Sequence, residues 1–245
     1  MDYSALAKSY NPLYYTNQLR DLLAAFYKTD KYKSYYKYDL VKIINDSLLK
    51  NYSGEQILKY RLANEFRNKN YVAAFEVKAK NSRADFLVIN GDTKSFEVKS
   101  KIDNLNRLGK QITDYGDVFE YNTVVIDKIH LNAVQHILPE YYGIWYYEGK
   151  KRVVFKESKY STKLCAKSQL ELFNKKELNF AFNETDYHII LSRYNSSKIN
   201  HALKHTLKER YKVRWNYLQI NWDNIFPIDV QFFFNMNVKP EIIYG

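Results

Sequence analysis

The chain has 245 residues, enough to bury one substantial hydrophobic core or two small ones. It carries 38 Lys and Arg against 27 Asp and Glu, so its formal net charge is +11 and a polyanion such as nucleic acid is the first partner to consider. No apolar stretch approaches the roughly 20 residues of a membrane span, and the opening residues lack the pattern of a signal peptide. We therefore expect a cytoplasmic protein with no membrane partner. The single Cys165 excludes an internal disulfide and a cysteine-based zinc cluster.

Residues 1–60 are expected to form a helical N-terminal region. Apolar residues recur at helical spacing after Thr16, which is a suitable N-cap, and again in the segment 38–52. A third helix is expected from Ser53, because Ser-Gly-Glu-Gln fits a capping box. That helix would carry Glu65 beside its apolar stripe.

The period changes towards two at Tyr71, which predicts strands. Three short runs rich in Val, Phe and Ile are expected to form consecutive antiparallel strands at 71–77, 83–89 and 95–100. Asn90-Gly91 between the last two is a strong hairpin signal. A helix, a strand, a second helix and another strand then follow at 103–119, 121–127, 130–139 and 143–147. The expected fold is therefore α/β.

The remaining residues, 151–245, are expected to form a mostly helical, basic C-terminal extension, with an edge strand at its start. A helix is expected at 166–182, and a strongly basic helix opened by a serine at 196–215. Basic residues on the second of these helices are predicted to contact nucleic-acid phosphates, with salt-sensitive and sequence-independent binding. They are Lys204, Lys208 and Arg210.

Two carboxylates are predicted to meet across the hairpin. Asp85 and Glu97 lie at equal distances along the chain from Gly91, so they should pair almost directly, and Lys99 leaves the same face as Glu97. Two such carboxylates repel each other unless a cation lies between them, and a hard divalent ion such as Mg²⁺ or Mn²⁺ prefers oxygen ligands. A neighbouring lysine can hold the attacking water or stabilise the charge of the transition state. This pattern indicates metal-dependent phosphodiester chemistry.

The helix expected after the hairpin carries a polar stripe beside its apolar one. Arg107, Gln111 and Tyr115 are spaced i, i+4 and i+8, so they share one side of the helix. An arginine can bind a phosphate with two hydrogen bonds, while the amide and the phenol donate beside it. The stripe is therefore predicted to orient a nucleic-acid backbone over the metal site.

These residues resemble those of a known superfamily. Asp85 followed by Glu97-Val98-Lys99, in the order helix, three strands, helix, strand, resembles the PD-(D/E)XK nuclease superfamily. Gln111-x-x-x-Tyr115 is similar to the Q-x-x-x-Y motif of its RecB-like branch. The surrounding segment also looks like a group of small bacterial and phage proteins of that superfamily. The likeness covers residues 60–150 and fades beyond them, and Ala84 stands where a proline is often written.

The resemblance implies a restriction-endonuclease-like core at residues 61–150 and a nuclease that hydrolyses DNA. Asp85, Glu97 and the backbone carbonyl of Val98 would bind Mg²⁺ or Mn²⁺, and Lys99 would position the nucleophilic water. The other catalytic residues it implies are Gln111 and Tyr115, with Arg107 binding the strand.

The resemblance also implies an additional upstream acid, for which Glu76 and Glu65 are the two choices, with Glu76 preferred. Two other functions stay open. One is an RNase, for example a tRNA-cleaving defence effector. The other is a catalytically inactive module that binds nucleic acid, a protein partner or a second copy of the chain.

Overall fold

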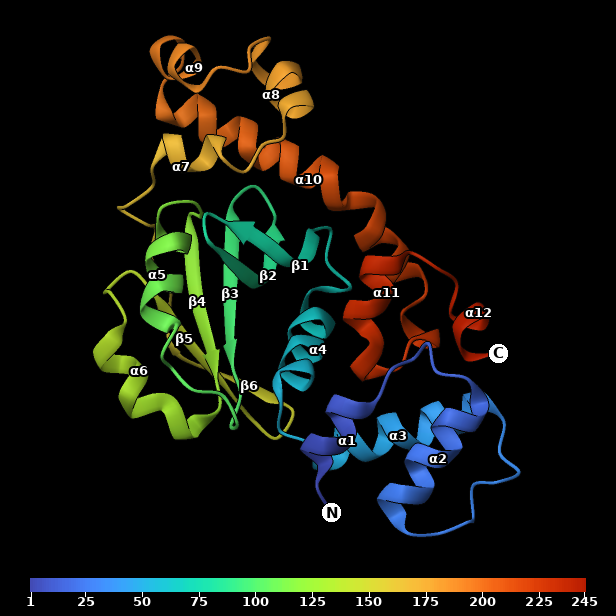
Figure 1. The fold of residues 1–245 in the computed structure, drawn as a ribbon. Helices are drawn as coiled ribbons and strands as arrows, with labels where there is room; N and C mark the ends of the chain where they lie inside the picture. The colour runs from blue at the N-terminus through green and yellow to red at the C-terminus, as the bar shows by residue number, and fades with distance from the viewer.

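A computed structural model describes residues 1–245 as a mixed α/β fold built on one six-stranded sheet (Figure 1). The strands follow one another across the sheet in chain order, so β1 and β6 form its two edges. Their bounds are β1 Val72–Ala79, β2 Ser82–Ile89, β3 Thr93–Lys99, β4 Tyr121–Ile126, β5 Gly143–Glu148 and β6 Lys151–Lys156. The sheet and the helical additions at both ends were expected, and the edge strand near residue 150 is confirmed as β6.

The three consecutive antiparallel strands are confirmed, and so is their register. Phe86 of β2 pairs with Phe96 of β3, which is the alignment that places Asp85 opposite Glu97. Gly91 in the connecting turn has φ +101°, a conformation that glycine adopts at little cost. Beyond β3 the sheet becomes parallel through β4 and β5, and β6 returns antiparallel at the edge.

Helices cover both faces of this sheet. α5 (Leu108–Gly116) and α6 (Leu131–Ile137) pack on one face, where Val124 points, and α4 (Glu55–Phe66) packs on the other, where Val125 points. Alternate residues of a strand face opposite sides, so β4 is apolar on both. On the α4 side, the rings of Phe66, Phe86 and Phe96 lie 5.7–6.2 Å from one another between centroids.

The N-terminal helices are α1 (Tyr3–Ser9), α2 (Thr16–Tyr27) and α3 (Lys37–Asn51). The predicted starts of two helices were wrong. Thr16 is the first residue of α2, and Tyr15 is the capping residue, with its N–H bound by the side chain of Gln18. α4 begins at Glu55 without the capping box expected from Ser53. The ring of Tyr52 lies so close to Gly54 that a Cβ there would overlap it, and this packing sets the turn instead.

The C-terminal region is helical, as expected, but its segments differ from the prediction. The expected helix at 166–182 is two helices, because Asn174 forms a capping box with Glu177 and starts a new helix there. The basic helix α10 is capped by Asn195 and not by a serine. The bounds are α7 Ala166–Leu170, α8 Lys175–Phe182, α9 Tyr187–Arg193, α10 Ser196–Ile220, α11 Val230–Met236 and α12 Pro240–Tyr244.

One hydrophobic core joins these regions. A single cluster of 48 buried residues runs from Leu6 in α1 to Tyr244 in α12, so the expected N-terminal, central and C-terminal regions share their packing. Figure 1 shows α12 beside the N-terminal helices, where it contacts α3, and α11 beside α4. None of the helices combines the length and the apolar character that crossing a bilayer requires.

A buried carboxylate ties the two ends of the chain together. Asp229 accepts hydrogen bonds from the hydroxyls of Tyr10 and Tyr244, at 2.9 Å each, and from the Asn45 amide at 3.2 Å. Burial raises the pKa of Asp229 to about 6, although these three hydrogen bonds favour the charged form. The folded protein therefore holds a proton on Asp229 at a pH where the unfolded chain has released it.

We expect this group to make stability fall as the pH rises. Between about pH 4 and pH 6 the folded state binds more protons than the unfolded state. The contribution of Asp229 to the free energy of unfolding is therefore lost as the pH rises across that window, and its size is about 1.4 kcal/mol for each unit by which the two pKa values differ. Urea unfolding of wild type and Asp229→Asn at several pH values measures it. The difference between their unfolding free energies should decline from pH 4 to pH 6 and then level off. A difference that does not vary with pH would contradict the assignment.

Candidate active site

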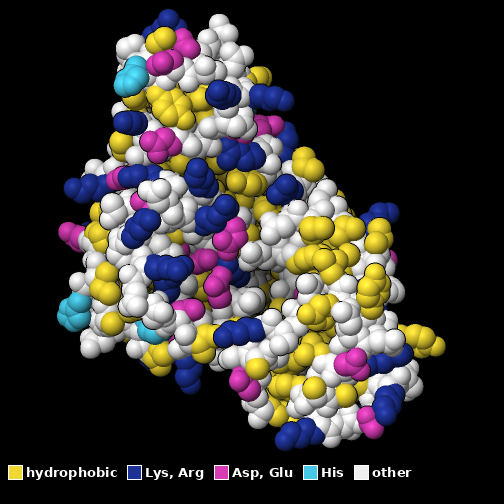
Figure 2. Space-filling model, viewed as in Figure 1, with side chains coloured by type: hydrophobic (Ala, Val, Ile, Leu, Met, Phe, Trp, Pro, Cys, Tyr) yellow, Lys and Arg dark blue, Asp and Glu magenta, His cyan; other side chains and the backbone are white.

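A polar pocket of about 890 Å³ opens where α4, the strands β2 and β3, and α5 come together. Its acids are Glu55, Glu76, Asp85, Glu97 and Asp103. Its bases are Arg83, Lys99, Arg107 and Lys110. Figure 2 shows acidic side chains beside a hollow in the middle of this face, with Lys and Arg side chains around them. Acids surrounded by bases suit a cation and an anion bound together.

Three of the predicted site residues, Asp85, Glu97 and Lys99, lie on the β2–β3 hairpin and line this pocket. Asp85 is buried, and its Oδ2 accepts a hydrogen bond of 2.6 Å from the backbone N–H of Val98. This bond fixes the carboxylate across the end of the β2–β3 ladder. Glu97 is only 2% exposed, and the Lys99 ammonium lies 2.6 Å from its Oε1. Asp85, Glu97 and Lys99 therefore lie together, as the register predicted.

The two motif residues of α5 both contact Glu97. Gln111 donates to its Oε1 at 2.5 Å, and the Tyr115 hydroxyl lies 2.6 Å from its Oε2 and 2.5 Å from the carbonyl oxygen of Arg83. The i, i+4 spacing on α5 thus brings a donor to each oxygen of one carboxylate. The other end of the Gln111 amide, Oε1, is buried without a hydrogen-bond partner in the protein. It is an acceptor that the protein's own groups leave unsatisfied.

The structure separates the two choices for the upstream acid. Glu76 lines the pocket, whereas Glu65 binds Tyr147 and Arg152, each at 2.6 Å, outside it. Glu76 also has φ +54° inside β1 and is skipped in the pairing with β2. A non-glycine residue with positive φ inside a strand is rare, and it often marks a functional site.

Replacing Glu76 with glycine is expected to stabilise the protein by about 1 kcal/mol, because glycine adopts positive φ without the steric cost that a Cβ brings. The measurement is urea unfolding at neutral pH without divalent ions. The matched control is Lys28→Gly, which removes the same steric cost of positive φ at an exposed residue, since Lys28 has φ +53° at the end of α2. A gain at residue 28 with a loss at residue 76 would show that the Glu76 carboxylate stabilises the empty pocket.

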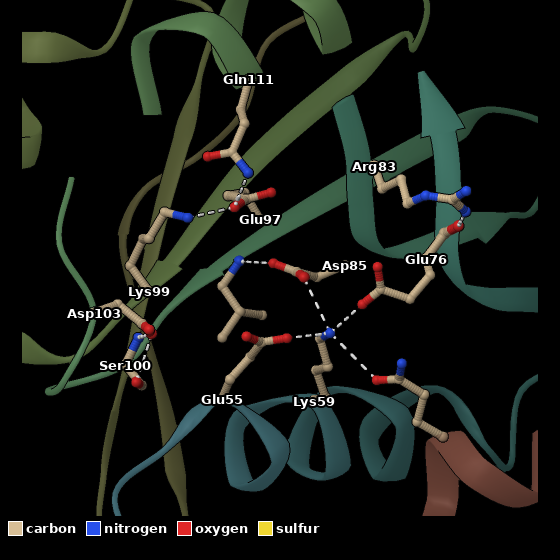
Figure 3. Close-up of polar contacts among 12 residues, drawn as sticks. Glu55, Lys59, Glu76, Arg83, Asp85, Glu97, Lys99, Ser100, Asp103 and Gln111 are labelled. Carbon is tan, nitrogen blue, oxygen red and sulfur yellow. Dashed lines mark hydrogen bonds and ion pairs between the residues drawn. The ribbon is translucent and has the colours of Figure 1, made fainter. Parts of the chain in front are cut away.

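Sequence reasoning missed two residues of the site, Glu55 and Lys59 in the first turns of α4. Lys59 is buried, and its ammonium lies 3.1 Å from Asp85 Oδ1 and contacts carboxylate oxygens of Glu55 and Glu76 (Figure 3). Their i, i+4 spacing was visible in the sequence. What was not visible is that this side of α4 faces the pocket, because that depends on packing between α4 and the sheet.

The electrostatics of the pocket favour an added cation. Burial, then the charge of Glu97, raises the pKa of Asp85 well above its usual range, and burial raises the pKa of Glu97 as well. Burial alone would lower the pKa of Lys59, but the charges of Asp85, Glu55 and Glu76 outweigh it and raise that pKa. The candidate ligand atoms are carboxylate oxygens, and no His or Cys lines the pocket. This donor set fits Mg²⁺ or Mn²⁺.

The other predicted nucleic-acid contacts divide between two places. Arg107 lies at the start of α5, exposed at the pocket. On α10, Lys204 is paired with buried Glu120 at 2.9 Å and Arg210 with Glu177 at 2.6 Å, while Lys208 is exposed. The pairs of Lys204 and Arg210 attach α10 to the rest of the fold. Neither side chain is free to contact a phosphate without giving up a carboxylate partner.

Comparison with known proteins gives a family but no activity. A family model described as bacteriophage P4 protein cII matches residues 44–233, a span that includes every residue of the pocket. No curated protein matches the chain. One solved structure, a Silicibacter pomeroyi protein of unknown function (SPO1766), is 18% identical and covers 47% of this chain and 77% of its own, with a TM-score of 0.36.

Proposed function

The chain belongs to the family of bacteriophage P4 protein cII, and we propose that it is a divalent-metal-dependent nuclease that hydrolyses phosphodiester bonds, with DNA as its substrate. The observation that carries this proposal is the convergence of Lys99, Gln111 and Tyr115 on the buried Glu97 carboxylate beside Asp85. Membership of the PD-(D/E)XK superfamily is part of the same proposal. The order α4, β1, β2, β3, α5, β4 supports it, with β1 to β3 antiparallel and β4 parallel to β3.

Asp85, Glu97 and the carbonyl oxygen of Val98 would hold the metal ion. When bound, Mg²⁺ or Mn²⁺ would offset charge on the phosphate oxygens and make a bound water more acidic. The protein supplies the orientation. Val98 fixes Asp85 through its N–H, and Gln111 with Tyr115 fixes both oxygens of Glu97, so neither carboxylate needs to reorganise when substrate arrives.

Lys99 and Gln111 would act on the attacking water. The ammonium of Lys99, held 2.6 Å from Glu97 Oε1, keeps donor hydrogens free to orient that water and to offset charge that develops on the phosphate. The Oε1 of Gln111, which has no partner in the protein, would accept a hydrogen from that water. Together they would aim the lone pair of the water at the phosphorus atom.

The exposed bases around the pocket would hold the nucleic-acid backbone. Arg83, Arg107 and Lys110 are exposed and line the pocket around its acids. Contacts from such side chains to phosphates position a strand without reading its sequence. We therefore expect little sequence specificity from the pocket itself.

The test uses purified protein with single-stranded and double-stranded DNA and RNA, in EDTA, Mg²⁺ or Mn²⁺. The wild type is compared with the Glu97→Ala, Lys99→Ala double variant. The matched control removes an exposed Glu–Lys pair that does not line the pocket, through Glu148→Ala and Lys128→Ala. Metal-dependent cleavage of DNA that survives the control and disappears in the first variant is the expected result. Cleavage of RNA alone would establish the RNase, and binding without cleavage by every protein would establish the inactive module.

A further inference from the structure

Lys59 projects from α4 into a group of three acids. Its side chain is 4% exposed, and its ammonium lies 3.1 Å from Asp85 Oδ1 while contacting Glu55 and Glu76 as well. Figure 3 shows this nitrogen between the three carboxylates. From α11, the amide oxygen of Gln231 accepts a hydrogen bond from it at 3.2 Å. The ammonium is thus held from several sides by oxygen atoms.

The same three acids have the spacing of a divalent-ion site. One oxygen from each of Glu55, Glu76 and Asp85 lies within 4.8 Å of the other two. Hard cations such as Mg²⁺ and Mn²⁺ take ligands of this kind. The position that an ion would take among them is the position of the Lys59 ammonium. A lysine so placed supplies one positive charge where a metal would supply two.

The charges of the pocket floor favour one further ion. Four carboxylates, those of Glu55, Glu76, Asp85 and Glu97, face the two ammoniums of Lys59 and Lys99. Within this ion-paired cluster two negative charges are left over, which is the charge of one divalent ion, while Asp103 and the exposed bases Arg83, Arg107 and Lys110 lie around the cluster. Without Lys59, three negative charges would remain, and three acids would face one another with no cation between them, which is costly in a buried place.

We infer that Lys59 is a built-in cation that takes the place of a second metal ion, so that this site binds a single divalent ion. The inference rests on the proposed function, since it concerns the metal content of that same site. It divides the acids into two groups. Glu55 and Glu76, with one oxygen of Asp85, hold Lys59, whereas Asp85 and Glu97 face the metal. Each carboxylate oxygen has two lone pairs, so Asp85 is able to serve both.

The experiment counts bound Mn²⁺ by electron paramagnetic resonance, without nucleic acid, so it does not depend on activity. Wild type is expected to bind one ion per chain. Lys59→Met keeps the length of the side chain but removes its charge, and it should bind two. Adding Glu55→Gln to that variant should return the count to one ion per chain. The Lys59→Arg variant keeps the positive charge, so it should bind one ion, as the wild type does.

The control is Lys204→Met, which removes another lysine that pairs with a buried glutamate, Glu120, outside the pocket. It should bind one ion. Two ions in wild type would overturn the inference and leave the proposed function standing, and this count decides the matter even where Lys59→Met fails to fold. One ion in a folded Lys59→Met variant would also overturn it. No ion in wild type would overturn the inference and the metal-dependent function together.

Discussion

Replacing Glu97 with glutamine is expected to reduce metal-dependent cleavage about a thousandfold, the loss typical when one preorganised electrostatic contact to a transition state is removed. Glutamine keeps the shape of the side chain and one acceptor oxygen. It loses the charge that would hold the ion and that Lys99, Gln111 and Tyr115 now contact. The measurement is the single-turnover rate on the substrate identified by the cleavage assay, at saturating Mg²⁺ or Mn²⁺.

The chain offers a closely matched control in Glu120. This glutamate is also 2% exposed and also accepts from several donors, among them the N–H of Thr93 at 2.7 Å and the ammonium of Lys204. It lies outside the pocket. Glu120→Gln should lower thermal stability and leave the rate per folded molecule unchanged. Equal losses of rate in both variants would attribute the effect to stability, and a Glu97→Gln rate within tenfold of wild type would exclude Glu97 as a metal ligand.

The part of the site that the sequence predicted is the part determined by short-range pattern. The Asn90-Gly91 turn sets the register of the hairpin, and the register aligns Asp85 with Glu97. The spacing of Gln111 and Tyr115 puts both on one side of α5, where they reach the same carboxylate. Each of these relations spans few residues, so turn chemistry and periodicity were enough.

The rest depends on contacts between distant segments. Lys59 contacts Asp85 only because α4 packs against the hairpin. The local sequence does not determine how a helix is rotated about its axis, and this rotation decides which side chains face the hairpin. The choice between Glu65 and Glu76 depended on the same rotation. The role of the basic residues of α10 could not be read from the sequence either, because Lys204 pairs with Glu120, which lies 84 residues away in the chain. A basic helix in a basic chain looks the same whether its lysines bind phosphates or neighbouring acids.

A divalent ion is expected to raise the melting temperature of the wild type by roughly 5–10 °C. At a concentration about 100 times its Kd, an ion that binds only the folded state adds about 2.7 kcal/mol, and a chain of this length gains about 2–4 °C for each kcal/mol. Asp85→Asn should abolish the shift, because asparagine keeps the size of the side chain but removes the charge that Glu97 repels. Thermal unfolding followed by circular dichroism, with Mg²⁺ and Mn²⁺ at constant ionic strength, measures both effects.

Glu65→Gln is the control for this shift, since Glu65 lies outside the pocket in contact with Tyr147 and Arg152, and its variant should keep the full shift. A full shift in Asp85→Asn would mean that the ion binds without Asp85. Its ligands would then come from the other acids of the pocket, among them Glu55, Glu76 and Glu97, and an ion between Glu55 and Glu76 would require Lys59 to leave them, because one position does not hold an ammonium and a divalent ion together. The response of this variant thus tests whether Asp85 is a ligand of the ion.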